Sequence, residues 1–550
     1  MQLTAALVLG AVCSTVSREA EAFAIDTGSP DLAVRWDNTV RVNAAWRVEK
    51  IDDTLADNFL YDESDYKFDR GDMVTQRVDL LSEFDVVWRQ HYGARVSAAG
   101  WYDYAYRNSD VKQNPALSEL PSSYHDKQYS GLTDDFYHGP YGEVLDAFAF
   151  MDQRFGDVPV VVKAGQFTTF WGMSLFYSGG IAQDQHALDG RKGAANPGTE
   201  TKELFLPLSQ VNVQAQLSPA VAIEGQYYLD WANTRSPEGG TFLGRADMVL
   251  QGPQQLGGDP LQGANLQRRS PLKPSDQEGN WGVSLKYSPD FLYGQTLGFY
   301  YRQFDEKVPW MFVVTPASNQ PKDLGYRAVY ARNTKLAGVS FDGQIGQWAV
   351  GAEVGYHMGT GLKSVGFAIA DEGARGDTWH ALVNGLYLLD RGPLWDTGTA
   401  VIELTYDRLD SVTKNEDLFL REGNPTCTIG RGGPPGSWRD GCATRDAWGL
   451  NVRFAPEWLS VLPSLDVTLP ITYQTGLDGN SAITALGVSE QATTVSVGVQ
   501  LDYRVIHRLA ITYDDYFAKR RTSNGVVVSG NGDYGVTDRG RVTITYSVAF

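Results

Sequence analysis

The chain of 550 residues contains only three cysteines, seven methionines and seven histidines. It also lacks any internal run of about eighteen apolar residues, which excludes a protein that crosses a membrane with helices. Cationic residues are outnumbered, because 47 Lys and Arg stand against 66 Asp and Glu and leave a formal charge of −19. Non-specific binding to nucleic acid is therefore excluded, since neutralising phosphates requires clustered cations. With 42% apolar and 21% charged residues, a disordered chain is excluded as well.

Glycine and large aromatic residues are abundant, with 58 Gly, 28 Tyr and 14 Trp. Glycines suit tight turns, and Trp and Tyr concentrate where protein meets the membrane–water interface. A transmembrane β-barrel needs both, and it escapes hydropathy scans because only alternate residues contact lipid. The composition favours such a barrel in the outer membrane of a Gram-negative bacterium.

Residues 1–22 have the layout of a secretory signal peptide: a short apolar run followed by the small-residue site Ala-Glu-Ala at 20–22. No Lys or Arg precedes the run, so either the true start lies upstream or the signal is weak. We interpret Cys13 as part of the signal rather than as a lipid-attachment site. The expected mature protein is one barrel domain over 23–550.

Three segments near the start alternate between apolar and polar residues: 34–48, 74–89 and 92–107. A period of two over about fifteen residues is longer than a usual soluble strand and matches a tilted membrane strand. In a barrel the charged face lines a water-filled lumen. The residues predicted to face the lumen are Arg35, Asp37, Arg41, Arg47, Arg77, Asp79, Glu83, Asp85, Arg89, Arg95, Asp103 and Arg107.

Breaks between alternating segments are long and short in turn along the whole chain. Short periplasmic turns and long external loops produce this order when both chain ends are periplasmic. The long gaps imply about eighteen strands, within about sixteen to twenty, and an even number closes the barrel without an exposed edge. Two apolar runs in one gap, 310–314 and 326–330, are interpreted as a hairpin above the membrane. The predicted fold class is all-β, a transmembrane antiparallel β-barrel.

The chain ends on an aromatic residue behind alternating apolar positions. Tyr546, Val548 and Phe550 belong to this apolar face. The ending resembles the signal that the bacterial barrel-assembly machinery reads, so we assign the three residues as the assembly signal and that machinery as a partner. The alternative is an ordinary C-terminal edge strand. Outer-membrane lipid and lipopolysaccharide are the other partners expected at this location.

Cys427 and Cys442 lie in one long gap, separated by a Gly- and Pro-rich stretch. In an oxidising compartment two nearby cysteines are more often bridged than reactive. A metal site needs further Cys or His nearby, and the sequence has none there. We predict a disulfide between them, and neither a metal nor a cofactor.

An acidic gap between the first two strands contains Asp or Glu at eight positions from 52 to 72. Such a loop can bind divalent cations that bridge lipopolysaccharide, because hard cations take oxygen ligands. It lacks the spacing of a preformed calcium loop, so a solvated acidic loop is the favoured interpretation.

The gap 171–206 combines aromatics, glycines and charged residues. Aromatics beside glycines can pack against a wall and turn sharply, and an eighteen-stranded barrel leaves an aqueous channel unless something narrows it. We predict that the segment folds into or across the lumen; the alternative is a loop folded over the mouth. The candidate constriction residues are Trp171, Phe176, Tyr177, Asp184, His186, Asp189, Arg191 and Lys192.

Catalytic motifs are missing from the sequence. It has no His-x-x-x-His pair, no Gly-x-Ser-x-Gly and no phosphate-binding loop. Asp184, His186 and Asp189 have no convincing nucleophile beside them, and we interpret them as polar loop residues. We therefore predict no enzyme and no catalytic residue.

Several sequence blocks resemble a known family. Lys163–Gly172 ends in Trp-Gly and is followed by Asn-Pro-Gly at 196–198 and Leu-Pro at 206–207; near the start, Ile25–Asp31 leads into Arg35–Val40. These blocks resemble a proteobacterial outer-membrane barrel family catalogued as domain of unknown function thirteen-oh-two. The resemblance spans essentially the whole mature chain.

Gln166 departs from the family's pattern, because members more often have Arg after the Gly of that strand. No role is therefore assigned to this position. Members resembling this chain tend to be encoded beside steroid, hydrocarbon or polyester catabolism genes, or beside envelope lipid transporters. The resemblance thus implies passage of apolar molecules and a periplasmic partner that carries lipid or substrate.

Three functions are open for such a barrel. The resemblance favours a transport channel for bulky apolar compounds or lipids, sterol- or fatty-acid-like. Charged lumen residues of both signs favour a general porin for small polar solutes. The third function is a structural barrel that conducts nothing. Energy-coupled import through a plugged barrel is disfavoured, because the first strand begins shortly after the cleavage site and leaves no room for a plug domain.

Overall fold

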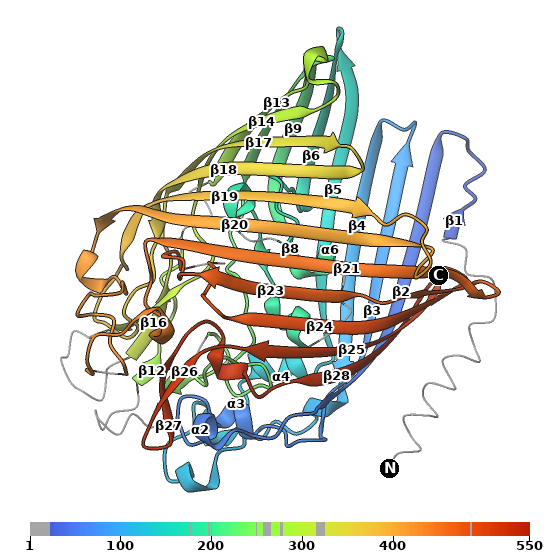
Figure 1. The fold of residues 1–550 in the computed structure, drawn as a ribbon. Helices are drawn as coiled ribbons and strands as arrows, with labels where there is room; N and C mark the ends of the chain where they lie inside the picture. The colour runs from blue at the N-terminus through green and yellow to red at the C-terminus, as the bar shows by residue number, and fades with distance from the viewer. Residues whose placement is uncertain are drawn as a thin grey trace.

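Eighteen antiparallel strands close into a single β-barrel (Figure 1). The predicted fold class is therefore confirmed. The predicted signal peptide, 1–22, lies outside the described residues. The computed structural model describes residues 23–176, 179–195, 199, 201–248, 250–256, 266–274, 279–314, 325–430, 432–484 and 487–550.

Each wall strand pairs with the wall strands before and after it in the chain, and β28 pairs with β2 to close the ring. β22 and β23 form one wall strand interrupted at Pro470, which lacks the N–H that a ladder needs. The short β1 (Phe23–Ile25) extends the pairing of β2. The wall strands are β2 Leu32–Arg47, β3 Met73–Trp88, β4 Tyr92–Asp103, β5 Tyr141–Phe155, β6 Val158–Phe167, β9 Leu208–Ser218, β10 Val221–Tyr228, β13 Trp281–Tyr287, β14 Thr296–Phe304, β17 Thr334–Ile345, β18 Trp348–Gly361, β19 Arg375–Leu388, β20 Thr397–Lys414, β21 Asp446–Leu462, β22 Leu465–Thr468 with β23 Ile471–Asp478, β24 Thr493–Tyr503, β25 His507–Phe517 and β28 Arg541–Ala549.

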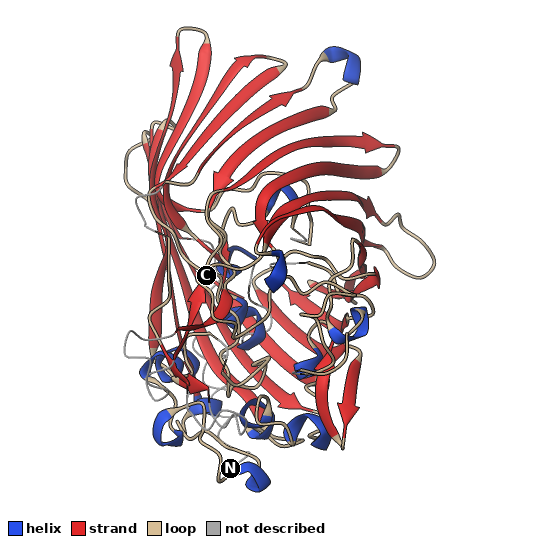
Figure 2. Ribbon diagram, turned by 90° about the vertical axis from the view of Figure 1, so that its left-hand side faces the viewer, coloured by secondary structure: helices blue, strands red, loops and turns tan. Residues whose placement is uncertain are grey.

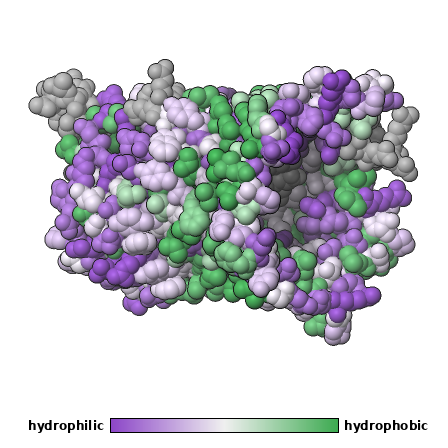
Figure 3. Space-filling view, turned by 90° about the horizontal axis from the view of Figure 1, so that it is seen from above, coloured by the Kyte–Doolittle hydropathy of each residue, from purple (hydrophilic) through white to green (hydrophobic). Residues whose placement is uncertain are grey.

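The two faces of each strand differ in the way a membrane barrel requires. On β3, the apolar Val78 and Leu80 are 44% and 45% exposed, whereas the polar Arg77 and Asp79 between them are 1% and 7% exposed. This distribution, with apolar residues on the outer face and polar residues on the inner face, is the reverse of the distribution in a soluble protein. Seen from above, a band of hydrophobic residues runs across the molecule, and a hollow opens beside it (Figure 3).

Two residues predicted to face the lumen do not project from a strand. Arg89 lies in the turn after β3, with a φ of 50°, and ion-pairs with Asp31. Arg107 follows the short helix η1 (Tyr104–Tyr106), because β4 ends at Asp103, and its side chain is exposed. The alternation of Tyr104 and Tyr106 imitates a longer strand, so the predicted placement of both arginines is corrected.

Short turns occupy one end of the barrel, at the top and right of Figure 1. Long loops occupy the other end, at the left and bottom of that figure. Most helices gather at the loop end (Figure 2), and no helix among the described residues is long and apolar enough to cross a membrane. The helices of four or more residues are α2 Asp53–Ala56, α3 Asp62–Tyr66, α4 Gly131–Tyr137, α5 Gly190–Ala195 and α6 Thr201–Leu204.

The long loops pack into an outer layer in which Tyr124, Tyr129, Phe136 and Phe242 are buried, in one cluster with Val74 and Trp101 of the wall. Four short strands form a separate sheet in the loops: β11 (Gln255–Leu256), β12 (Leu266–Arg268), β16 (Gly325–Val329) and β15 (Trp310–Val314). β15 and β16 pair antiparallel, which confirms the predicted hairpin outside the barrel wall.

The acidic loop is part of this layer and is solvated only in part. Asp53, Asp57, Asp69 and Asp72 are exposed, as expected, whereas Asp62, Glu63 and Asp65 are each at most 2% exposed, which corrects the interpretation for these three. The physical reason is that partners from distant segments bind them: Asp62 accepts the N–H of Asn114, and Asp65 receives the guanidinium of Arg47 at 2.8 Å.

The predicted disulfide joins Cys427 and Cys442 in the loop between β20 and β21, with Cα atoms 5.8 Å apart. No barrel strand lies between the two cysteines.

Replacing both cysteines by serine should loosen this loop and leave the barrel folded. The bridge restricts a ring of about fifteen residues, an effect of roughly 3 kcal/mol that falls on the loop alone. Limited proteolysis should cut between 424 and 445 faster in the double variant, while the melting of the barrel stays unchanged. A barrel that melts earlier by the same free energy would show that the loop supports the wall.

Deleting Phe550, or replacing it with Asp, should strongly impair assembly. Phe550 exchanges two backbone hydrogen bonds with Asn38 where the barrel closes, at 2.8 and 2.9 Å, and every strand depends on closure to satisfy its backbone. The measurement is the amount of heat-modifiable barrel in the outer membrane. Phe550→Tyr is the matched control and should assemble normally; normal levels of the Asp and deletion variants would refute the assembly signal.

Candidate functional site

Some of the charged lumen residues predicted on the first three strands pair with one another, and others pair with residues of the loops. Arg35 contacts Asp37 at 2.6 Å, and Arg95 holds Asp85 with two hydrogen bonds of 2.6 and 2.8 Å. The members near the turn end stay partly exposed, whereas Arg41, Arg47, Arg77, Asp79 and Asp103 near the loop end are buried. Something therefore fills the loop-side half of the lumen.

A segment between β6 and β9, residues 168–207, fills much of that space; we refer to it as the crossing segment. It leaves the wall after Phe167 and returns at Leu208. Trp171 packs with Ile181 of the segment and with Tyr300, Phe304 and Leu336 of the wall. These contacts place its first part against β14 and β17.

The next part of the crossing segment is held by carboxylates of β18 and β20. Glu353 accepts the backbone N–H of Met173 at 2.6 Å and of Ile181 at 2.9 Å, and Glu403 accepts that of Leu175 at 2.7 Å. The amide of Asn384 on β19 donates to the carbonyl of Met173 at 2.5 Å. We call Glu353, Asn384 and Glu403 the wall clasp.

Gly180 is required at this contact. Its φ is 74°, and a Cβ there would collide with the Glu353 carboxylate and with the ring of His380. A side chain in place of Gly180 would therefore push the segment off the wall.

Other wall strands anchor the rest of the segment. Arg302 of β14 donates to the carbonyls of Ile181 and Gln183 at 2.8 and 2.7 Å, and Gln185 donates to Gln226 of β10 at 3.1 Å. These contacts extend the attachment of the segment along the wall from β14 to β10, with only β13 between the two strands.

Three more anchors lie on β2, β5 and β28. Arg41 of β2 binds Glu203 at 2.6 Å, Glu143 of β5 pairs with Lys192, and Arg541 of β28 donates to the carbonyl of Ala194. Together with the wall clasp, these anchors show that the described residues of the crossing segment, 168–176, 179–195, 199 and 201–207, run across the lumen.

Most candidate constriction residues lie buried within the crossing segment. Asp184 accepts the backbone N–H of Lys307 at 2.9 Å, and Asp189 pairs with Arg191 and with Arg235. Phe176 is partly exposed, and Tyr177 lies outside the described residues. The set is therefore largely brought together, as the framework of the segment.

His186 is a structural residue of the crossing segment. Its ring accepts the backbone N–H of Thr169 at 2.9 Å. Burial, which disfavours the charged imidazole, lowers the pKa of His186 to about 3. The ring is thus neutral at physiological pH and fixes the start of the segment.

Sequence analysis missed the wall clasp. Glu353, Asn384 and Glu403 sit at inward positions of ordinary alternating strands, each facing the lumen beside apolar outward neighbours. Extending the alternation analysis to β18–β20 would have found polar inward residues, but not that the crossing segment binds them.

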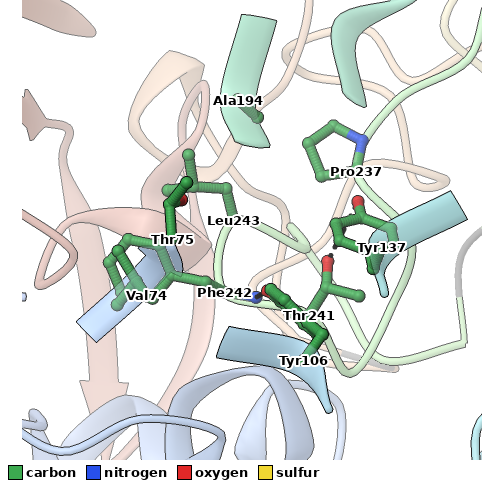
Figure 4. A pocket seen from close by; sticks show the side chains of 9 residues that line it. All are labelled: Val74, Thr75, Tyr106, Tyr137, Ala194, Pro237, Thr241, Phe242 and Leu243. Carbon is green, nitrogen blue, oxygen red and sulfur yellow. Dashed lines mark hydrogen bonds between the residues drawn. The ribbon is translucent and has the colours of Figure 1, made fainter. Parts of the chain in front are cut away.

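The crossing segment also touches the outer layer. A small pocket of about 10 Å³ lies between Ala194, Val74 of β3 and the loop residues Thr241 and Phe242 (Figure 4). In this pocket the hydroxyl of Tyr106 accepts the N–H of Phe242 at 3.2 Å. The crossing segment and the outer layer therefore meet at this apolar pocket.

A group of buried carboxylates lies under the outer layer. Asp247 accepts the N–H groups of Glu63 and Ser64 at 2.9 and 2.8 Å. The pKa of Asp62 and that of Glu63 are each raised to about 8. Burial is the larger cause, and the nearby negative charge of Asp247 is the next. Among the described residues no group of His, Cys, Asp and Glu has the arrangement of a metal site.

Three comparisons relate the chain to known proteins. The model of the family described as protein of unknown function, DUF1302, matches residues 3–550. OccAB4 of Acinetobacter baumannii is similar with a TM-score of 0.42 and 12% identity, covering 94% of this chain and 98% of that chain. OpdK of Pseudomonas aeruginosa, solved with vanillate, gives a TM-score of 0.43 and 12% identity over the same shares. No curated protein matches.

The outer layer should loosen as the pH rises from about 5 to about 8. A carboxyl whose pKa is raised in the folded protein stabilises it fully below the ordinary pKa, and this stability is lost progressively until the pH reaches the raised value. Hydrogen exchange of residues 58–66, corrected for the intrinsic rate, should therefore accelerate between about pH 5 and about pH 8 and level off above that. The Asp62→Asn, Glu63→Gln double variant is the control and should show no acceleration; the same acceleration in that variant would exclude these carboxyls as the cause.

Proposed function

The chain belongs to the DUF1302 family, and we propose that it is a selective channel of the outer membrane with the crossing segment as its constriction. The observation that carries this proposal is the set of anchors that hold residues 168–207 across a wide, polar lumen. A barrel with a purely structural role has no need to narrow its interior in this way. Both described chain ends lie at the short-turn end, which supports a periplasmic position for them.

The cargo we propose is a bulky, largely apolar compound, sterol- or fatty-acid-like. Two partly exposed aromatic rings on the inner face of β5, Phe148 and Phe150, support it, and the buried Phe167 of β6 packs against Phe148. Lys163 lies among these rings, with its Nζ 3.6 Å and 4.1 Å from the centroids of Phe148 and Phe167. The barrel-assembly machinery, lipopolysaccharide and a periplasmic carrier of lipid or substrate are its proposed partners.

The second candidate is a general porin for small polar solutes. The paired charges near the turn end, Arg35 with Asp37 and Arg95 with Asp85, favour it. Amide side chains on β9, among them Asn212 and Gln214, add to the polar inner surface. Such a lining passes hydrated solutes at little desolvation cost.

Deleting residues 176–194 should raise single-channel conductance and the uptake of small polar solutes, because the constriction is removed. Uptake of a sterol should fall in the same variant if the segment guides an apolar cargo. The measurements are planar-bilayer recordings and uptake of a labelled sterol and of a sugar. Unchanged conductance would exclude the constriction, and a native protein that already conducts sugars freely would favour the porin.

A smaller change should give the same direction of effect. The Glu353→Ala, Glu403→Ala double variant removes three hydrogen bonds that the carboxylates accept from backbone N–H groups of the crossing segment. Each such bond with a charged acceptor contributes about 1.5–3 kcal/mol. The variant should therefore raise conductance and the protease sensitivity of the chain near residue 175. Glu457→Ala, on β21 near the turn end, is the matched control and should leave protease sensitivity unchanged. Equal effects of both changes would trace the gain to lost lumen charge rather than to release of the segment.

A further inference from the structure

The crossing segment covers the inner face of the barrel unevenly. The row of paired residues Asn384, Glu403, Asn451, Gln474, Thr494 and Tyr516 runs from β19 to β25 on that face. At its start Asn384 and Glu403 are 5% and 0% exposed beneath the segment, whereas Gln474 and Thr494 remain partly exposed. The crossing segment thus covers the β19 and β20 residues of this row and leaves the β23 and β24 residues accessible.

Neighbouring inward residues show the same contrast. Thr405 on β20 is 2% exposed, but Ser496 on β24 and Thr472 on β23 are partly exposed, and Arg453 on β21 is exposed. The anchors described above lie on β2, β5, β10, β14, β18, β19, β20 and β28. The inner face of β23–β25 thus borders the part of the lumen that remains open.

A cleft lies beside the loop-side end of this row. Tyr516 ends the row and, with its exposed neighbour Phe517, lines a cleft of about 480 Å³, together with Gln491, Lys519, Arg520 and Thr537. Next to it on the inner face of β25, Asp514 is partly exposed and contacts Arg541 at 3.3 Å. An accessible inner face and an open cleft therefore adjoin.

We propose that solutes cross the barrel along the inner face of β23–β25, between this wall and the crossing segment, and pass through the cleft beside Tyr516. This inference rests on the proposed channel function and refines it. The wall of the route presents the hydroxyls of Thr472, Thr494 and Ser496 and the amide of Gln474, with the guanidinium of Arg453 beside them. The route therefore suits a cargo whose hydroxyl or carboxylate group can bind this wall, as in the sterol- or fatty-acid-like compound proposed above, because a cargo with no polar group would leave these side chains without partners.

Cysteine labelling tests the route. Cys427 and Cys442 are bridged, and a Cys13→Ser background removes the third thiol of the chain, so Ser496→Cys introduces a single reactive site. A membrane-impermeant methanethiosulfonate should label it about tenfold faster than Thr405→Cys, because a buried thiol reacts only through local opening. Thr405→Cys is the matched control, inward-facing but beneath the segment. Equal labelling of the two, or faster labelling of Thr405→Cys, would overturn the route.

Flux measurements separate the route from the channel function. Uptake of the labelled sterol should be slower through Ser496→Cys after thiol labelling than through the unlabelled variant. Unchanged uptake after complete labelling would overturn the route. If the native protein takes up no sterol and conducts no ions, the channel function fails, while the labelling ratio still reports on the open face. Heat modifiability shows whether each variant has folded. Thr378 lies on β19 and is 4% exposed, so Thr378→Cys replaces the control if Thr405→Cys does not fold.

Discussion

The structure depends on one constraint, that no backbone N–H or C=O can face lipid without a partner. Pairing of β28 with β2 meets it by removing both edges of the sheet. Closure then fixes which residues point inward, because side chains alternate along every strand. The polar inner face follows from this geometry, and the crossing segment can be held only because that face carries charged and amide groups.

The crossing segment raises the same problem inside the lumen, because much of it has no regular secondary structure and its peptide groups need partners. The wall supplies them: Glu353 and Glu403 accept N–H groups, and Arg302 donates to carbonyls. Part of the polar lining therefore serves the protein itself. Polarity of the lumen is for this reason weak evidence about cargo, and the polar groups that remain accessible on β23–β25 are the more informative ones.

The barrel could be predicted from the sequence because its signals are local. Alternation with period two gives the strands, and the two cysteines within one loop give the disulfide. Contacts between distant segments leave no such signal. The burial of Asp62 depends on Asn114, and the wall clasp depends on the path of residues 173–181. The prediction that Arg89 faces the lumen was wrong because charged residues occur in turns as well as on lumen faces. Only the left-handed backbone of Arg89 shows that it belongs to a turn.

Energetics favours a fixed constriction over a gate that swings open. Glu353, Glu403 and Arg302 make five hydrogen bonds with a charged partner to the crossing segment. At about 1.5 kcal/mol each, the low end for such bonds, releasing the segment costs roughly 7 kcal/mol before any apolar contact is broken. An unassisted open state would then be populated about once in 10⁵ molecules, since each 1.4 kcal/mol is a factor of ten. A route along β23–β25 breaks none of these bonds, so the barrel can select solutes with the segment in place.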